Sequence, residues 1–404
     1  MPVFPPPQEE INDLMAALGA ERELNTNSIE KDKKMTKNHY SILIAGILSA
    51  SIAMSANAGT EWEIKVFDKH MSFIDINNSG QLLGYDSAIK RYFITGPDGE
   101  GISNITEFSN NLNVKAFNDS GQIAGSFLKD GSSHVFITGP NGTSMVDLGT
   151  LGKHSLASDI NNSGQIIGQF TTPENNTHAF ITGSNGIGMT DLGTFGGKNS
   201  YASAINESGQ VVGWSQTADG IYHAFITGPN GIGMTDLGTL PYDNASQATD
   251  INDAAQVVGF SGSYSPDWGY VSTGGFITGP NGENMIPLGV GNPNSPKINN
   301  SGQAIVNSDL GLAYFYSDGV LTMLSGLSIF REVGFDEISA FGINDKGQIL
   351  GSGYSLEECC KPVAFLLTPI SPVPEPSTYA MLLAGLGLLG FKPFKRKMKL
   401  PTSC

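Results

Sequence analysis

The chain has 404 residues, of which 15% are charged and 39% are hydrophobic, with 51 glycines and a formal net charge of -16. Residues 59 to 371 alone hold 12 Lys or Arg and 30 Asp or Glu. Such an acidic balance repels phosphate backbones and argues against a nucleic-acid partner. The three cysteines, two of them adjacent at 359 and 360, do not make a disulfide framework.

The N-terminal residues have the pattern of an export signal. Lys33, Lys34 and Lys37 precede an apolar run over 41–53, and Ala56-Asn57-Ala58 offers small residues for cleavage after Ala58. This order predicts a secretory signal peptide over 35–58. Residues 1–34 are then interpreted as a disordered or misassigned stretch upstream of a true start at Met35.

A unit with an Asn and a Gln four residues later recurs seven times, at intervals of 41 to 47 residues. A period of this length is typical of one four-stranded propeller blade per repeat. The Asn residues are Asn77, Asn118, Asn161, Asn206, Asn252, Asn299 and Asn344, and the Gln residues are Gln81, Gln122, Gln165, Gln210, Gln256, Gln303 and Gln348.

The fourth unit shows how one repeat divides into four strands. A strand ends at Ile205, an Asn-Glu-Ser-Gly turn follows, and a second strand starts at Gln210. A third strand over 223–227 and a fourth over 234–238 flank a Pro-Asn-Gly turn. The third strand carries a Phe in every unit, which we expect to fill the space between blades. These residues are Phe93, Phe136, Phe180, Phe225, Phe276, Phe315 and Phe365.

The two ends of the array complement one another. The seventh unit has no fourth strand, whereas residues 61–67 form a spare strand before the first unit. Pairing the two would remove exposed edges. The sequence therefore predicts a closed, all-β, seven-bladed propeller over 59–370. A β-solenoid or an open array of β units is the alternative.

Loops between the second and third strands, and between blades, vary most from unit to unit, which is typical of a binding face. Aromatic rings beside carboxylates suit sugars, whose C–H faces stack on the rings while hydroxyls form hydrogen bonds. The candidate ligand-binding residues are Trp214, Asp219, Tyr222, Tyr242, Asp243, Tyr264, Asp267, Trp268 and Tyr270.

No catalytic motif is present in the sequence, so we expect a non-enzymatic module that binds a polysaccharide or a matrix protein. The alternative is a lyase-like enzyme with an acid or base among Asp219, Asp243 and Asp267. We expect no cofactor. Asp75 and Asp159 begin loops with the oxygen spacing of a calcium site, but turn chemistry explains all seven copies. His134, His178 and His223, at one position of three blades, are interpreted as structural.

The C-terminal segment, 371–404, contains Pro374-Glu375-Pro376, then 13 apolar residues over 379–391, then a basic tail. This order resembles the PEP-CTERM sorting signal of Gram-negative exosortase systems. The resemblance implies export, a transient membrane anchor, cleavage by exosortase near Pro374-Glu375-Pro376, and delivery to the cell surface or extracellular matrix. Thirteen apolar residues are short for a permanent span, which requires about 20.

The repeats resemble a second family. His178-Ala179-Phe180, His223-Ala224-Phe225 and the Asp-Leu-Gly-Thr phrases at 191–194 and 236–239 are similar to extracellular HAF repeats. Units 1, 5, 6 and 7 lack the His. The resemblance implies an extracellular location and no particular activity.

Overall fold

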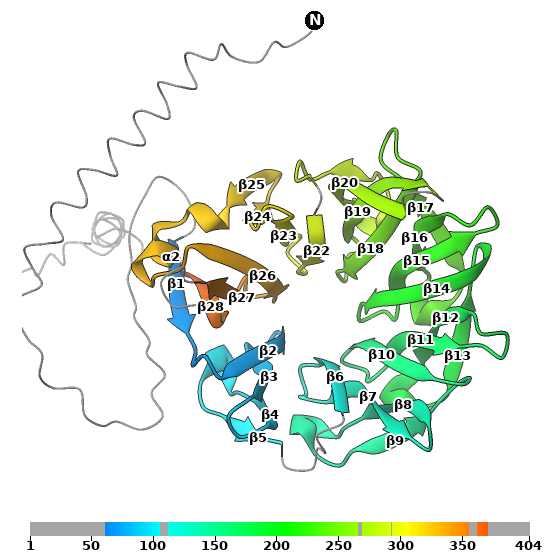
Figure 1. The fold of residues 1–404 in the computed structure, drawn as a ribbon, viewed down its shortest axis with the longest axis horizontal. Coiled ribbons are helices and arrows are strands. Elements are labelled where there is room, and N and C mark those ends of the chain that lie inside the picture. Colours follow the sequence, from blue (N-terminus) through cyan, green and yellow to red (C-terminus); the bar gives the residue numbers. More distant parts are fainter. Residues whose placement is uncertain (1–60, 106–111, 266–268, 292, 355–361, 371–404) are drawn as a thin grey trace, which may run out of the picture. The chain divides into compact units, whose positions relative to one another are not determined.

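The computed structural model describes residues 61–105, 112–265, 269–291, 293–354 and 362–370, which all belong to one compact unit, Ile47–Cys404. The expected signal peptide and sorting segment lie outside the described residues. Within them the chain forms seven four-stranded antiparallel sheets, and Figure 1 shows these sheets arranged around a central axis. This confirms the seven-bladed β-propeller.

The first four blades follow the chain without interruption. Blade 1 contains β2 (Met71–Ile76), β3 (Leu82–Asp86), β4 (Arg91–Ile94) and β5 (Ser103–Asn104). Blade 2 contains β6 (Leu112–Phe117), β7 (Ile123–Lys129), β8 (Ser132–Ile137) and β9 (Val146–Gly149). Blade 3 contains β10 (Ser155–Ile160), β11 (Ile166–Thr171), β12 (Thr177–Thr182) and β13 (Met189–Gly193). Blade 4 contains β14 (Gly196–Ile205), β15 (Val211–Thr217), β16 (Tyr222–Thr227) and β17 (Met234–Gly238).

The last three blades include the one that combines both ends of the array. Blade 5 contains β18 (Ala245–Ile251), β19 (Val257–Ser265), β20 (Gly269–Ile277) and β21 (Ile286–Pro287). Blade 6 contains β22 (Pro293–Ile298), β23 (Ala304–Ser308), β24 (Ala313–Ser317) and β25 (Val320–Met323). Blade 7 contains β26 (Glu337–Ile343), β27 (Ile349–Tyr354), β28 (Val363–Ile370) and the N-terminal β1 (Glu61–Val66). A short helix that the sequence did not predict, α2 (Ser328–Glu332), precedes blade 7.

The expected closure by the N-terminal strand is confirmed. Strand β1 pairs antiparallel with β28, from Glu61 opposite Ile370 to Val66 opposite Phe365. Figure 1 shows the blue β1 lying beside the orange β28. The first described strand thus completes the last blade, and it is one residue shorter than the sequence indicated.

The repeated phenylalanines form the core between strands and blades. All seven are buried, six of them completely, while Phe315 is 7% exposed. In six blades the residue opposite this Phe on the second strand is glycine; in blade 6 it is Ile305. A Cβ added at Gly125 would lie 2.7 Å from the ring of Phe136, so the ring occupies the space of a missing side chain.

The repeated asparagines join neighbouring blades through a closed ring of hydrogen bonds. Each Asn is buried, and its Nδ2 donates to the backbone carbonyl of the equivalent Asn in the next blade, at 2.9 to 3.2 Å. The same nitrogen donates to Oε1 of the Gln four residues later, at 2.8 to 3.0 Å. Because Oδ1 of the same group accepts turn N–H groups, the position needs a side chain that both donates two protons and accepts, which is an amide and not a cation.

The residue after each Asn forms a second ring, on the surface. Its backbone N–H donates to a side-chain oxygen of the equivalent residue in the next blade, at 2.8 to 3.2 Å. All seven residues therefore carry a carbonyl or carboxylate oxygen. They are Asn78, Asp119, Asn162, Glu207, Asp253, Asn300 and Asp345.

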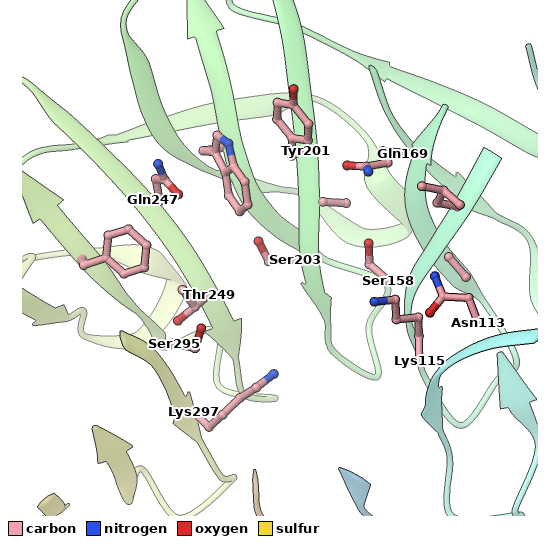
Figure 2. A pocket seen from close by; sticks show the side chains of 15 residues that line it. Asn113, Lys115, Ser158, Gln169, Tyr201, Ser203, Gln247, Thr249, Ser295 and Lys297 are labelled. Carbon is pink, nitrogen blue, oxygen red and sulfur yellow. The ribbon is translucent and has the colours of Figure 1, made fainter. Parts of the chain in front are cut away.

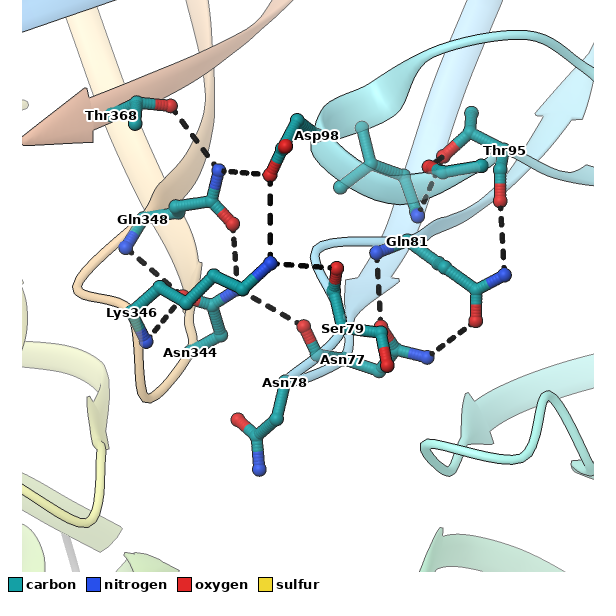
Figure 3. Close-up of polar contacts among 12 residues, drawn as sticks. Asn77, Asn78, Ser79, Gln81, Thr95, Asp98, Asn344, Lys346, Gln348 and Thr368 are labelled. Carbon is teal, nitrogen blue, oxygen red and sulfur yellow. Dashed lines mark hydrogen bonds and ion pairs between the residues drawn. The ribbon is translucent and has the colours of Figure 1, made fainter.

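Charged side chains reinforce the junction where the ring closes (Figure 3). Asn344 of blade 7 donates to the carbonyl of Asn77 of blade 1 at 3.0 Å, which links residues 267 positions apart. Lys346 donates to Ser79 O at 2.9 Å and lies 3.6 Å from Asp98. Nζ of Lys65, on β1, donates to the carbonyls of Asp98 and Gly99, and to Glu100 at 2.6 Å. Blades 1 and 7 are thus tied together by more than β-strand pairing.

Replacement of the closing amide tests the asparagine ring. We expect Asn344→Ala to lower the free energy of unfolding by about 2–4 kcal/mol, because the carbonyl of Asn77 and two turn N–H groups lose a buried partner. Urea denaturation followed by tryptophan fluorescence measures the change.

The matched control is Asn113→Ala. Asn113 is exposed, and its change should stay within about 0.5 kcal/mol. Equal effects of the two substitutions would contradict a structural role for the ring.

Candidate functional site

A cavity of about 410 Å³ is lined by the innermost strands of blades 2 to 6, which face the central channel, and by the second strands of blades 3 to 5. We call it the channel pocket. Figure 2 shows polar side chains from these strands converging on it. The lining residues are Asn113, Lys115, Leu156, Ala157, Ser158, Gln169, Tyr201, Ala202, Ser203, Trp214, Gln247, Thr249, Phe260, Ser295 and Lys297.

A β-bulge in each innermost strand brings extra side chains to the pocket. The register of the first strand pair shifts at the same place in every blade. In blades 2 to 5 the additional residues are Lys115, Ser158, Ser203 and Thr249, and all four line the pocket. A bulge breaks the alternation of faces and redirects a side chain, so these residues could not be assigned to the channel from a period of two.

Aromatic rings form one wall. Tyr201 of β14 and Trp214 of β15 are stacked, with ring centroids 5.3 Å apart and planes 21° from parallel. Phe260 of β19 also lines the pocket. All three rings remain partly exposed, and a flat apolar surface of this kind can stack against the C–H face of a sugar ring.

Polar side chains with free hydrogen-bonding capacity form another wall. Asn113 and Lys115 are exposed, and Ser158 and Gln169 are partly exposed. In the described part of the chain, none of these four side chains has a hydrogen-bond or ion-pair partner. Ser203 and Thr249 differ, because their hydroxyls donate across blades to Ala248 O and Pro296 O at 2.8 and 2.7 Å.

Three carboxylates lie beside the pocket, two residues before the repeated Asn. In blade order the residues at this position are Asp75, Ala116, Asp159, Ala204, Asp250, Lys297 and Gly342. Asp159 accepts the N–H of Ile160 in its own blade at 2.8 Å and that of Ile205 in blade 4 at 3.1 Å. Asp75 and Asp250 make equivalent bonds. One carboxylate thus accepts N–H groups from two adjacent blades, so the next blade needs no carboxylate of its own. This explains why Asp and Ala alternate at this position in blades 1 to 5.

The positive charge of Lys297 offsets the negative charge of these carboxylates. Its Nζ lies 3.9 Å from Asp250, and its side chain is 37% exposed. Burial raises the pKa of Asp75 to about 6 and that of Asp159 to about 7, although Lys297 opposes both shifts. Asp250, followed by Asp159 and Asp75, raises the pKa of Lys297, and this outweighs the opposing effect of its partial desolvation. Lys297 is therefore a cation at neutral pH, whereas Asp75 and Asp159 exchange their protons at a pH of about 6 and about 7.

The ligand-binding residues predicted in blade 4 lie at different distances from the channel pocket. Trp214 lines it, and the ring of Tyr222 lies 6.4 Å from that of Tyr201. Asp219 is exposed in the loop after β15, and Tyr242 is fully exposed after β17. Neither of these last two lines the pocket.

The predicted residues of blade 5 form a separate group. Asp243 accepts a hydrogen bond from Thr273 Oγ1 at 2.8 Å, and Tyr270 packs against Phe260 with ring centroids 5.9 Å apart. Tyr264 is partly exposed on β19. Asp267 and Trp268 lie outside the described residues, so the predicted set stays a prediction.

The three repeated histidines pair with aspartates on the fourth strand of their own blades. His134 lies 2.9 Å from Asp147, and His178 and His223 form equivalent pairs with Asp191 and Asp236. Each pair ties the third strand to the edge strand. This agrees with the structural interpretation of these histidines.

The loops with calcium-like spacing use their oxygens within the fold. Oδ1 of Asn77 and of Asn161 accepts turn N–H groups, and the carboxylate of Asp159 is shared between blades. Within the described ranges, no three His, Cys, Asp or Glu side chains are close enough to hold one metal ion. The turn interpretation accounts for this geometry.

The charge balance beside the channel pocket should make stability depend on pH. The pKa values of Asp75 and Asp159 in the folded protein are about 6 and about 7, above their ordinary 3.8, so their contribution to stability is complete below pH 3.8 and is lost as the pH rises from there through 6 to 7. Lys297→Met removes the cation that limits this loss. We expect it to destabilise the protein more at pH 8 than at pH 5, by no more than about 1 kcal/mol because solvent screens the partly exposed ammonium group, as measured by urea denaturation.

Lys198→Met is the control, because Lys198 is exposed and lies away from the carboxylates, at the start of β14. Its effect should be the same at both pH values. A Lys297→Met effect without pH dependence would contradict the proposed coupling.

Comparison with known proteins identifies the C-terminal signal. A model of the PEP-CTERM protein-sorting motif matches residues 372–397, which include Pro374-Glu375-Pro376. This motif marks an exported protein that exosortase recognises and processes at the cell surface. No helix among the described residues has the length and apolar character needed to cross a membrane. The HAF resemblance stays a prediction.

The remaining comparisons concern the fold. No curated protein is significantly similar to the chain in sequence. An oligogalacturonate lyase in complex with manganese is similar in structure, with a TM-score of 0.51 and 12% identity over 81% of this chain and 99% of that one. The β-propeller domain of the Trilobed protease from Pyrococcus furiosus has a TM-score of 0.50 and 10% identity, over 76% of this chain and all of that one. At such identities the similarity extends to the β-propeller fold alone.

Proposed function

We propose that this exported propeller is a non-enzymatic module that binds a polysaccharide in its central channel. The supporting observation is that the stacked rings of Tyr201 and Trp214 line a cavity together with amide, hydroxyl and ammonium groups that have no hydrogen-bond partner among the described residues. Sugar rings need this combination, because their C–H faces stack on aromatic rings while their hydroxyls require hydrogen-bond partners.

The proposed place of action is the surface or extracellular matrix of a Gram-negative bacterium. A signal peptide over 35–58 would start export, and exosortase would act near Pro374-Glu375-Pro376. The acidic repeat region would then meet polysaccharide outside the cell. A matrix protein is the alternative ligand.

A polysaccharide lyase is the second candidate function. It is favoured by the similarity of the fold to that of an oligogalacturonate lyase. Of the three acids expected for this role, Asp219 is exposed in a loop, Asp243 accepts a hydrogen bond from Thr273, and Asp267 lies outside the described residues. Asp219 and Asp243 do not line the channel pocket, and this favours the binding function.

Two tyrosines distinguish binding in the channel from binding on the outer loops. We expect Tyr201→Ala to weaken binding of the best ligand from a glycan array at least about tenfold, since it removes half of the stacked pair. Tyr242→Ala, at a fully exposed tyrosine away from the pocket, should leave affinity unchanged. Isothermal titration calorimetry measures both.

The same experiment separates the candidate functions. Loss of affinity in Tyr242→Ala but not in Tyr201→Ala would place the ligand on the outer loops and contradict the channel proposal. Appearance of an unsaturated product from a bound glycan would identify a lyase. A Tyr201→Phe variant, which retains the ring, should bind as the native protein does.

A further inference from the structure

The side chains that line the channel pocket differ in charge from the repeat region around it. Residues 59 to 371 contain 12 basic and 30 acidic residues. Among the fifteen described residues that line the pocket there are two lysines, Lys115 and Lys297, and no Asp or Glu. Lysines are thus the charged residues of the lining, although Asp75, Asp159 and Asp250 lie close enough to interact with one of them, Lys297.

The two lysines differ in what surrounds them. Lys297 lies 3.9 Å from Asp250 and is coupled to Asp75 and Asp159, so its charge is compensated by the fold. Lys115 is the bulge residue of β6, is exposed, and has no ion-pair partner in the described part of the chain. It is therefore the cation that remains available to a ligand.

The surroundings of Lys115 specify where a negative charge would lie. Figure 2 shows Lys115 near Asn113 and Ser158, while Tyr201 lies across the pocket on β14. None of the side chains of Asn113, Lys115 and Ser158 is engaged elsewhere in the described residues. A ligand that stacks one ring face on Tyr201 would thus direct its polar edge toward an ammonium group flanked by an amide and a hydroxyl.

We propose that the channel pocket selects anionic sugars, with Lys115 binding the carboxylate of a uronic acid residue. This inference rests on the proposed polysaccharide-binding function and names the class of its ligand. A carboxylate can form a charge-assisted hydrogen bond with the ammonium group and also accept from the neighbouring amide. A neutral sugar leaves the lysine without a counter-charge, so selectivity should exceed what stacking provides.

The test compares each ligand with its own neutral derivative. Oligogalacturonate and oligomannuronate, and the methyl ester of each, are titrated into the full chain by calorimetry at low ionic strength. We expect one of the two acids to bind at least about tenfold more tightly than its methyl ester, and added salt to reduce this difference. The ester keeps the ring and nearly the same shape, so it isolates the contribution of the charge.

Variants assign the effect to Lys115. Lys115→Met should abolish the preference, so that this variant binds acid and ester with equal affinity, whereas Lys115→Arg should retain the preference. Lys198→Met removes an exposed lysine outside the pocket and should change neither affinity. Urea denaturation of each variant verifies that it is folded.

The outcomes separate this inference from the function on which it rests. Equal binding of acid and ester, reduced by Tyr201→Ala but not by Lys115→Met, would overturn the anionic selectivity and retain the channel as a glycan site. Absence of binding by any glycan, acidic or neutral, would overturn both. A preference for the acid that persists in Lys115→Met would overturn the role of Lys115.

Discussion

The hydrogen bond from each repeated asparagine to the backbone of the next blade is the constraint on which the rest of the structure depends. Seven of these bonds form a closed ring, and the last one joins Asn344 to Asn77. Because each amide also binds its Gln and the turn N–H groups, one residue type fixes the hairpin of its own blade and the position of the next. β1, pairing with β28, closes the ring at its outer edge.

Interblade bonds of this kind leave the innermost strands free to differ. The bulge occurs in every blade, but the residue it adds changes from Lys115 to Ser158, Ser203 and Thr249. The alternating carboxylates next to the bulge bind two blades each and are compensated by Lys297. The repeated residues therefore form the scaffold. The residues that vary among the innermost strands determine which polar and charged groups line the channel pocket.

Much of the fold followed from the sequence, because the repeat period, the turn residues and the missing strand of the seventh unit each have a direct geometric meaning. The buried phenylalanines were also predicted, as was closure by an N-terminal strand. The channel pocket was not. The variable loops of the sequence pointed to Trp214, but no pattern pointed to Lys115 and Tyr201, because a bulge breaks the period of two that assigns side chains to a face.

A crystal structure of the protein with a bound oligouronate would test the proposed site in the channel pocket. The proposed mode of binding predicts one sugar ring stacked on Tyr201 within the channel, with its carboxylate within hydrogen-bonding distance of Lys115 Nζ. A sugar bound at the outer loops near Tyr242, with an empty channel, would contradict it.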